Sequence, residues 1–210
     1  MKYSFIAIEG NIGAGKTSLA TKIATEKNAK LILEQFEENS FLPKFYKEPE
    51  KYAFSLEMSF MAARYHQLKN NLGTLDLFKS FVISDYFIVK SLIFAKKNLP
   101  EDEFNLYTNF FNIIFQQLPK PDLLVYLYVD TDRLQGNIKK RGRPYEQDIK
   151  NEYLNKIQTG YLEFIKQQKD MRILILDTNN LDFVQKQEDY QKITDCLDRD
   201  YPIGIHRIAF

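Results

Sequence analysis

The chain has 210 residues, of which 44% are hydrophobic and 27% are charged, a composition that fits one compact α/β domain with a full core. Its 29 basic and 28 acidic residues nearly balance, so no bulk electrostatic field favours a nucleic acid polymer or an anionic membrane as a partner. The single cysteine excludes an internal disulfide framework, and no apolar run approaches about 18 residues, so we expect a soluble cytoplasmic protein.

The first predicted element is a buried strand over residues 3–8, which runs straight into residues 10–17. These residues satisfy every fixed position of the phosphate-loop pattern G-x-x-x-x-G-K-[ST]. Glycines let the backbone curl until its N–H groups point at phosphate oxygens. Lys16 supplies a charge at the β/γ-phosphates, the Thr17 hydroxyl binds Mg²⁺, and the helix that follows adds its N-terminal dipole. The residues expected to bind ATP are Gly10, Asn11, Ile12, Gly13, Ala14, Gly15, Lys16, Thr17 and Ser18.

Strands and helices alternate along the rest of the chain. Short apolar runs predict further buried strands at residues 30–33, 81–84, 123–129 and 172–176. Helical patterns cover about residues 15–26, 50–70, 86–97, 102–117, 131–140, 149–169 and 186–197. This alternation implies right-handed crossovers and a parallel sheet. We predict a P-loop NTPase-type three-layer α/β/α fold with a five-stranded parallel sheet and a helical lid, forming one domain over residues 1–198 with a C-terminal tail at 199–210.

Glu34 ends the second predicted strand. In an open parallel sheet the carboxyl ends of the strands form the ligand crevice, beside the phosphate loop. A carboxylate at this point can orient or deprotonate an attacking hydroxyl. The alternative is a surface acid in a Glu-rich loop.

A basic stretch over residues 137–146 is broken by Gly142 and Pro144 at the end of a helical pattern. Lysines and arginines that repel one another on a loop suit a polyphosphate, because phosphoryl transfer needs its spread charge clamped. We expect a lid at about residues 139–148, in which Arg141 and Arg143 act on the phosphates. A solvated helix face is the alternative for a charge run.

Glu57, Met61 and Arg64 fall at i, i+4 and i+7 of one helix and therefore share a face. An acid and a cation separated by a methionine can hydrogen-bond a planar heterocycle, and Phe111 can stack on it. The alternatives are an ion pair without a ligand for the charged residues and a place in the core for the aromatic ring.

The chain resembles the deoxyribonucleoside kinase family over nearly its whole length, to about Phe183. The resemblance begins with Ile8-Glu9-Gly10-Asn11-Ile12-Gly13-Ala14-Gly15-Lys16-Thr17, whose Glu-Gly-Asn-Ile form is much narrower than the general phosphate loop. It implies that Glu34 activates the deoxyribose 5′-hydroxyl and that Tyr46 contacts the sugar 3′-hydroxyl. It also implies that Arg64 contacts the base.

The same resemblance covers the second half of the chain. In the lid signature the family's arginines, here Arg141 and Arg143, grip phosphates, and its glutamate, here Glu146, meets the 3′-hydroxyl. Asp182 and Phe183 resemble the loop that holds the adenine of the donor.

Three departures from the family pattern stand out. The family usually has an arginine in an acid-Arg-Ser triplet after its third strand, whereas this chain reads Ser84-Asp85-Tyr86. We assign Asp85 the acid's role, holding Mg²⁺ through water together with Thr17. Lys90 or Lys139 is the candidate replacement for the lost cation, although lysine cannot reproduce bidentate geometry.

The other departures are Glu57, where a glutamine normally reads the base edge, and Asn137, where the lid commonly begins with arginine. An ionised glutamate only accepts hydrogen bonds. Either the substrate donates to Glu57, or Glu57 pairs with Arg64 or Lys90.

We therefore expect a deoxynucleoside kinase of nucleotide salvage that uses ATP and Mg²⁺, prefers a purine deoxynucleoside by family analogy, and forms a homodimer through the helices near residues 50–70 and 86–117. A thymidylate-type nucleoside-monophosphate kinase and a non-catalytic nucleotide-binding regulatory subunit are the alternatives. A GTPase is disfavoured because no Asn-Lys-x-Asp segment occurs.

Overall fold

The computed structural model describes residues 1–35, 39–74, 76 and 78–210, except for the side chain of Tyr46. The chain divides into two compact units. Unit 1 consists of Met1–Leu33, Asp76–Tyr86 and Lys120–Phe210, and unit 2 consists of Glu34–Leu75 and Phe87–Pro119.

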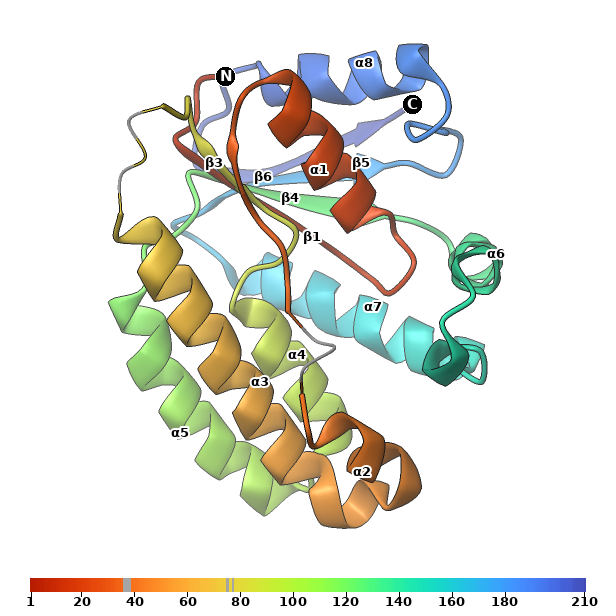
Figure 1. Ribbon diagram of the computed structural model, residues 1–210. Coiled ribbons are helices and arrows are strands. Elements are labelled where there is room, and N and C mark those ends of the chain that lie inside the picture. Colours follow the sequence, from red (N-terminus) through yellow and green to blue (C-terminus); the bar gives the residue numbers. More distant parts are fainter. Residues whose placement is uncertain (36–38, 75, 77) are drawn as a thin grey trace. The chain divides into compact units, whose positions relative to one another are not determined.

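Unit 1 contains a parallel sheet in the order β2-β3-β1-β4-β5-β6 (Figure 1). Buried apolar runs form its centre, as expected of strands covered on both faces. The predicted parallel sheet is confirmed, but it has six strands rather than five. The strands are β1 (Phe5–Gly10), β2 (Lys30–Ile32), β3 (Val82–Ser84), β4 (Leu123–Tyr128), β5 (Arg172–Asp177) and β6 (Gly204–Ala209).

The additional strand, β6, lies in the segment 199–210, for which no element was predicted. It runs parallel to β5 in register from Arg172 opposite Gly204 to Asp177 opposite Ala209. Its residues alternate between half-buried and exposed. Ile205 and Ile208 are an odd number of residues apart, so they point to opposite faces. The sequence of β6 therefore lacks the two-residue apolar period by which a half-buried strand is recognised.

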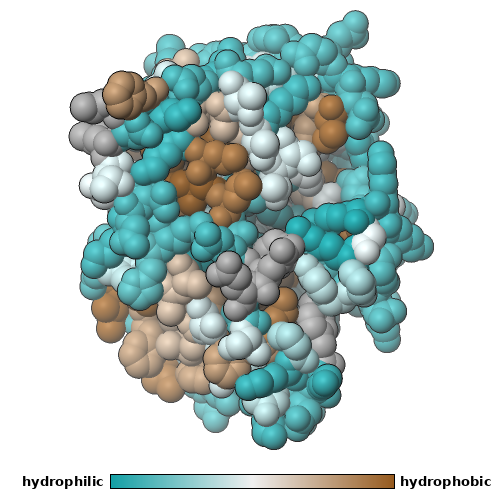
Figure 2. Space-filling model, viewed as in Figure 1, coloured by the Kyte–Doolittle hydropathy of each residue, from teal (hydrophilic) through white to brown (hydrophobic). Residues whose placement is uncertain are grey.

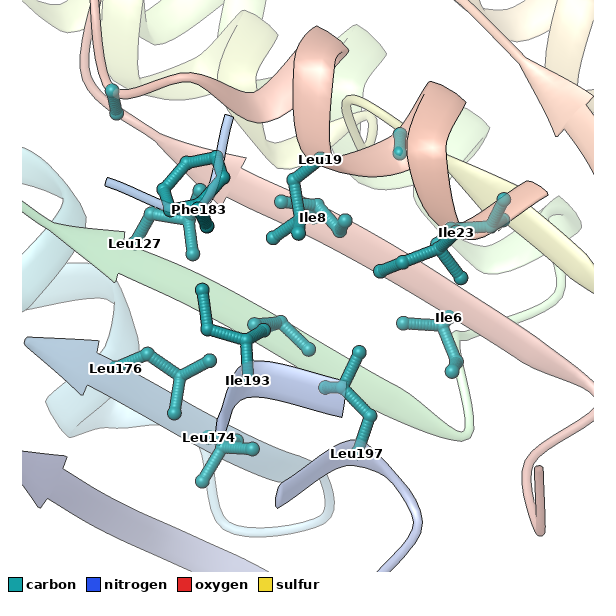
Figure 3. Close-up of a cluster of buried hydrophobic side chains, with 14 of the residues drawn as sticks. Ile6, Ile8, Leu19, Ile23, Leu127, Leu174, Leu176, Phe183, Ile193 and Leu197 are labelled. Atoms are coloured by element: carbon teal, nitrogen blue, oxygen red, sulfur yellow. The ribbon is translucent and has the colours of Figure 1, made fainter. Parts of the chain in front are cut away.

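Helices cover both faces of this sheet, which confirms the three-layer architecture. Side chains of α1 and α8 meet alternate residues of the strands on one face, where Ile8, Leu19 and Ile193 join one buried cluster (Figure 3). On the other face the Tyr161 ring of α7 contacts the Tyr126 ring of β4, with centroids 5.2 Å apart. The helices of unit 1 are α1 (Lys16–Glu26), α6 (Thr131–Arg141), α7 (Asn151–Gln167) and α8 (Gln187–Leu197).

Unit 2 is helical. Its long central helix, α3, contacts the other helices of the unit (Figure 1). The helices are α2 (Leu42–Lys47), α3 (Pro49–Leu72), α4 (Val89–Asn98) and α5 (Glu101–Gln117). The sequence did not predict α2, because six residues are too few to show a helical period. No helix in the described part of the chain is long and apolar enough to cross a membrane.

The loop after β1 lies very close to α6. Gly13 has a φ of +82°, in the left-handed region that favours glycine. A Cβ atom on Gly13 would stand 2.9 Å from the Leu134 carbonyl oxygen and 3.0 Å from Ile138 Cγ1. By contrast, a Cβ on Gly136, in the middle of α6, would meet nothing within 4 Å. An added methyl group should therefore strain the structure at Gly13 but not at Gly136.

We expect Gly13→Ala to lower the free energy of unfolding by about 1–3 kcal/mol, because both the backbone conformation and the space exclude a side chain. We expect Gly136→Ala to raise it by about 0.5–1 kcal/mol, because alanine favours a helix interior over glycine. Urea unfolding of both variants, followed by circular dichroism, measures the two changes. Equal effects of the same sign would contradict this account of the loop.

Candidate active site

The loop between β1 and α1 is held by two asparagine side chains. Asn11 Nδ2 donates to the Leu154 carbonyl oxygen at 2.8 Å, and Asn11 Oδ1 accepts from the Ile12 N–H at 2.8 Å. Asn137 of α6 donates to the Gly13 carbonyl oxygen at 2.8 Å. The residues of the phosphate-loop pattern therefore form a loop that these hydrogen bonds fix to α6 and α7. This pre-organisation spares a bound phosphate the entropy cost of ordering the loop.

Lys16 lies over this loop, where its Nζ donates to the carbonyl oxygens of Gly10 and Asn11 at 2.9 and 2.8 Å. Lys16 is also the first residue of α1, so its charge adds to the positive end of the helix dipole. Thr17 and Ser18 follow in the exposed first turn. The predicted residues of the loop thus lie together at the N-terminus of α1, a position that suits an anion.

Thr17 and Asp85 are in contact. Thr17 Oγ1 donates to Asp85 Oδ2 at 2.5 Å, and the Asp85 N–H donates to the Ile32 carbonyl oxygen at 3.1 Å. Hydroxyl and carboxylate oxygens suit Mg²⁺, which usually keeps several waters and takes oxygens from bound phosphates. The described residues contain no group of three or more His, Cys, Asp or Glu side chains placed to hold a metal. A magnesium ion beside Thr17 and Asp85 would therefore take its remaining ligands from water or from nucleotide oxygens.

The lid arginines share one carboxylate. Arg141 and Arg143 both form ion pairs with Glu146, the second at 3.4 Å. Gly142 ends α6 with a φ of +74°, which turns the chain between the two arginines. Both arginine side chains are about one third exposed, whereas that of Glu146 is 9% exposed. The lid thus presents two partly exposed cations around one internal carboxylate.

The segment expected to hold the donor adenine has a well-defined environment. The Asp182 N–H donates to Asp189 Oδ2 at 2.9 Å. Phe183 is buried, and its ring lies against the phosphate loop, where a Cβ on Gly15 would stand 2.7 Å from Phe183 Cζ. Phe183 therefore contributes to the core under the loop.

In unit 2, Glu34 lies between two cations. Arg64 of α3 donates to Glu34 Oε1 through Nε at 2.8 Å, and its Nη2 lies 2.6 Å from the same oxygen. Lys90 Nζ of α4 lies 2.5 Å from Glu34 Oε2. Burial alone raises the pKa of Glu34, but the charges and hydrogen bonds of Lys90 and Arg64 outweigh this effect and hold that pKa far below its usual range. Glu34 is therefore ionised at every physiological pH.

Glu57, Met61 and Arg64 all lie buried on the same side of α3, so their predicted shared face is confirmed. Glu57 does not pair directly with Arg64. Its Oε1 accepts from Asn98 Nδ2 at 2.6 Å, while Arg64 binds Glu34 and donates to Ser91 Oγ at 2.7 Å. Burial raises the pKa of Glu57 to about 7 against the opposing effects of Asn98, Arg64 and Lys90.

The remaining predicted residues are Phe111, Tyr46 and Lys139. Phe111 is buried in α5, with its ring stacked on Phe115 at a centroid distance of 5.4 Å. Tyr46 belongs to α2, but its side chain is outside the described part of the structure. Lys139 is exposed on α6 in unit 1. Of the two candidate lysines, Lys90 is the one that contacts Glu34.

Three polar residues of the site were not predicted. Ser91 and Asn98 of α4 bind Arg64 and Glu57, and Asn137, noted only as a departure, binds the phosphate loop. Ser91 and Asn98 had no signal of their own in the sequence, because their roles depend on which face of α4 meets α3. A weak signal was present for Asn137, because an amide at the expected position of a lid arginine can donate to a backbone carbonyl oxygen.

The fold and the loop define a phosphate-loop nucleotide-binding protein. Comparisons with known proteins identify its family. The deoxynucleoside kinase family model matches residues 6–200. The chain is 36% identical to the deoxyguanosine kinase of Bacillus subtilis, over 90% of this chain and 93% of that protein. It is 30% identical to the deoxyguanosine kinase of Lactobacillus acidophilus, over 91% and 88%. The chain belongs to the deoxynucleoside kinase family.

Solved structures are similar as well. The deoxyadenosine kinase from M. mycoides with the products dCMP and dCDP has a TM-score of 0.79 and 30% identity, over 92% of this chain and 98% of that one. The same enzyme with bound dATP gives a TM-score of 0.79 at 29% identity, over 93% and 100%.

We expect Lys90→Met to lower the free energy of unfolding at neutral pH by about 1–3 kcal/mol, because it removes one of the two cations from a largely buried carboxylate. A depressed carboxyl pKa stabilises the fold above the pKa of the unfolded chain, and this stabilisation is lost as pH falls through the folded-state pKa. The variant's deficit should therefore shrink between about pH 5 and about pH 2.

Urea titrations at several pH values measure this difference. Lys166→Met, at an exposed position of α7, is the matched control and should change stability by less than about 0.5 kcal/mol. A deficit that stays constant down to the lowest pH would show that Lys90 acts through packing rather than through its charge.

Proposed function

We propose that this chain transfers the γ-phosphoryl group of ATP to the 5′-hydroxyl of a deoxyribonucleoside, with a purine deoxynucleoside preferred and Mg²⁺ as the metal. The observation that carries the proposal is the carboxylate of Glu34, kept ionised by Arg64 and Lys90 in a chain with a complete phosphate loop. Names of relatives support the purine preference, since they include deoxyguanosine and deoxyadenosine kinases.

Glu34 acts on the acceptor hydroxyl. A carboxylate with so low a pKa is a weak base, so it orients the hydroxyl and accepts its proton only once the bond to phosphorus has begun to form. This suits phosphoryl transfer, whose loose transition state needs positioning and charge stabilisation more than a strong base.

Lys90 takes the place of the arginine that is missing after β3. Its ammonium contacts one oxygen of Glu34 while Arg64 binds the other, so both oxygens are held by cations from two helices. A lysine supplies a point charge rather than a planar fork. In this proposal Arg64 supplies the directional contact to one oxygen and Lys90 the charge at the other.

Unit 1 supplies the groups that act on the donor. Lys16 and the loop N–H groups bind the β- and γ-phosphates, and Thr17 with Asp85 holds Mg²⁺. When the phosphates arrive, they replace Glu146 as the partner of Arg141 and Arg143, which then stabilise the charge of the transferring group. Glu146 becomes available for the sugar 3′-hydroxyl. Asp182 and Phe183 remain the proposed contacts of the adenine, and Tyr46, Met61 and Phe111 those of the acceptor nucleoside.

The charges of unit 2 favour a nucleoside over a nucleoside monophosphate as acceptor. A monophosphate brings about two negative charges and needs cations of its own. Arg64 already binds Glu34, and a phosphate on that arginine would place its charge beside a carboxylate. The thymidylate-type alternative is therefore the weaker one.

We expect the protein to phosphorylate a purine deoxynucleoside with ATP and Mg²⁺, and Glu34→Gln to lower kcat by about 10²–10⁴-fold, because the amide neither accepts the hydroxyl proton nor balances the two cations. Chromatography of the products formed from each common deoxynucleoside and its 5′-monophosphate measures the reaction. Glu101→Gln, at an exposed position in α5, is the control and should keep full activity.

Phosphorylation of the monophosphate but not the deoxynucleoside would favour the thymidylate-type kinase. Binding of ATP without any product would favour the regulatory subunit. An unchanged kcat in Glu34→Gln would refute the role of this carboxylate.

We also propose that the protein is a homodimer that uses α5. Leu106, Phe110 and Ile113 lie at i, i+4 and i+7 on this helix and are 49%, 45% and 59% exposed. Figure 2 shows apolar side chains gathered over this part of unit 2. A row of exposed apolar side chains along a helix is typical of an association surface.

We expect Phe110→Glu to convert the dimer to a monomer, because a charge at the centre of an apolar interface loses its hydration without gaining a partner. Sedimentation equilibrium measures the mass. Val184→Glu, at an apolar position of unit 1 that is 49% exposed, is the control and should remain dimeric. A wild-type protein that sediments as a monomer would refute the proposal.

A further inference from the structure

Glu57 has a buried oxygen that the fold does not use. The Glu57 side chain is 2% exposed, and its Oε1 accepts a hydrogen bond from Asn98. Its Oε2 is buried without a hydrogen-bond partner among the residues that the structure describes. An unsatisfied buried carboxylate oxygen is costly, so it requires a further partner such as a ligand, a water or an ion.

The surroundings of Glu57 set its charge. Arg64 lies on the same helix, Lys90 and Asn98 on α4, Tyr107 on α5, and Glu34 precedes α2. Both cations are already paired with Glu34, so they compensate the burial of Glu57 only in part. The resulting pKa of about 7 means that the ionised and protonated forms of Glu57 are both populated near neutral pH.

Tyr107 contributes no charge of its own to this balance. Its hydroxyl donates to the Glu57 carbonyl oxygen at 3.4 Å, and burial raises its pKa well above the usual range, so it stays neutral.

The two forms of Glu57 present different hydrogen-bonding patterns. An ionised carboxylate only accepts, which matches the adjacent N1–H and N2–H₂ donors of guanine. A protonated carboxyl offers one donor and one acceptor, like a glutamine amide, and this matches N1 and N6–H₂ of adenine. An ionised carboxylate facing N1 of adenine, or a protonated one facing both N1–H and N2–H₂ of guanine, leaves buried polar groups unpaired.

We propose that Glu57 selects the purine base through its protonation state, with the ionised side chain binding deoxyguanosine and the protonated side chain binding deoxyadenosine. This inference rests on the proposed deoxynucleoside kinase function. It makes base preference a property that changes with pH in the neutral range, because neither purine gains or loses a proton there.

The test is the ratio of kcat/KM for deoxyguanosine to that for deoxyadenosine, measured with the wild-type protein between about pH 6 and about pH 8. In the limit where each base accepts only one form, the ratio rises about tenfold per pH unit. The ratio cancels every effect of pH on ATP, Mg²⁺ and Glu34, which both reactions share.

Glu57→Gln should remove the pH dependence of the ratio, because an amide has one fixed donor and one fixed acceptor and does not titrate. Glu101→Gln, the same change at an exposed position of unit 2, should keep the wild-type slope. Thermal unfolding confirms that each variant is folded.

Calorimetry in buffers of different ionisation enthalpy gives a second readout that needs no turnover. At neutral pH, binding of deoxyguanosine should release protons and binding of deoxyadenosine should take them up. A purely structural Glu57 changes neither quantity.

A flat ratio in the wild type, with both nucleosides phosphorylated, would overturn this inference and leave the kinase function intact. Absence of product from every deoxynucleoside would instead refute the kinase function, and the calorimetric measurement would then decide the role of Glu57. Equal proton exchange with both nucleosides, or no binding of either, would overturn the inference.

Discussion

Unit 2 is organised by the need to compensate the buried charge of Glu34. An isolated buried carboxylate is strongly unfavourable, so a chain that buries one must bring cations to it. Arg64 comes from the middle of α3 and Lys90 from the start of α4, so the ion pairs join these two helices to the segment that follows β2. Ser91 holds another nitrogen of Arg64, and the Phe60 ring lies 4.9 Å from its guanidinium carbon. The helices α3 and α4 of unit 2 are therefore positioned by the same interactions that keep the Glu34 carboxylate ionised.

The same pairing explains the unusual state of Glu57. Arg64 and Lys90 act electrostatically on both Glu34 and Glu57, and Glu34 takes the direct contacts of both cations. Glu57 receives only one amide hydrogen bond and the residual field of the cations, which does not offset its burial. One carboxyl in the unit therefore has a pKa far below normal and the other a pKa near 7. Environments that separate the pKa values of two like groups give them different chemical roles.

Most of the fold could be predicted because its signals are local. The phosphate-loop residues and the apolar runs of the inner strands lie within short windows, and the alternation of strands and helices implied the parallel sheet. The edge strand β6 was missed because Ile205 and Ile208 point to opposite faces, and α2 because it is short. Candidate site residues could be named where a residue type is tied to a strand end, as with Glu34 and Asp85, and their roles stay predictions. Asn98 and Ser91 could not be predicted, because their roles depend on how α3, α4 and α5 meet.

The chain has no arginine at the point after β3 where the family pattern places one. At that point the chain has Tyr86, which is fully buried in unit 1, so no cation is placed there. Lys90 lies one turn of helix further along the chain, in the first turn of α4, and reaches Glu34 from that position. An ammonium on a flexible stem contacts a single oxygen, and the planar guanidinium of Arg64 fixes the other. The orientation of Glu34 therefore depends mainly on Arg64, and Lys90 mainly contributes charge, so the pairing of Glu34 does not require arginine at both positions.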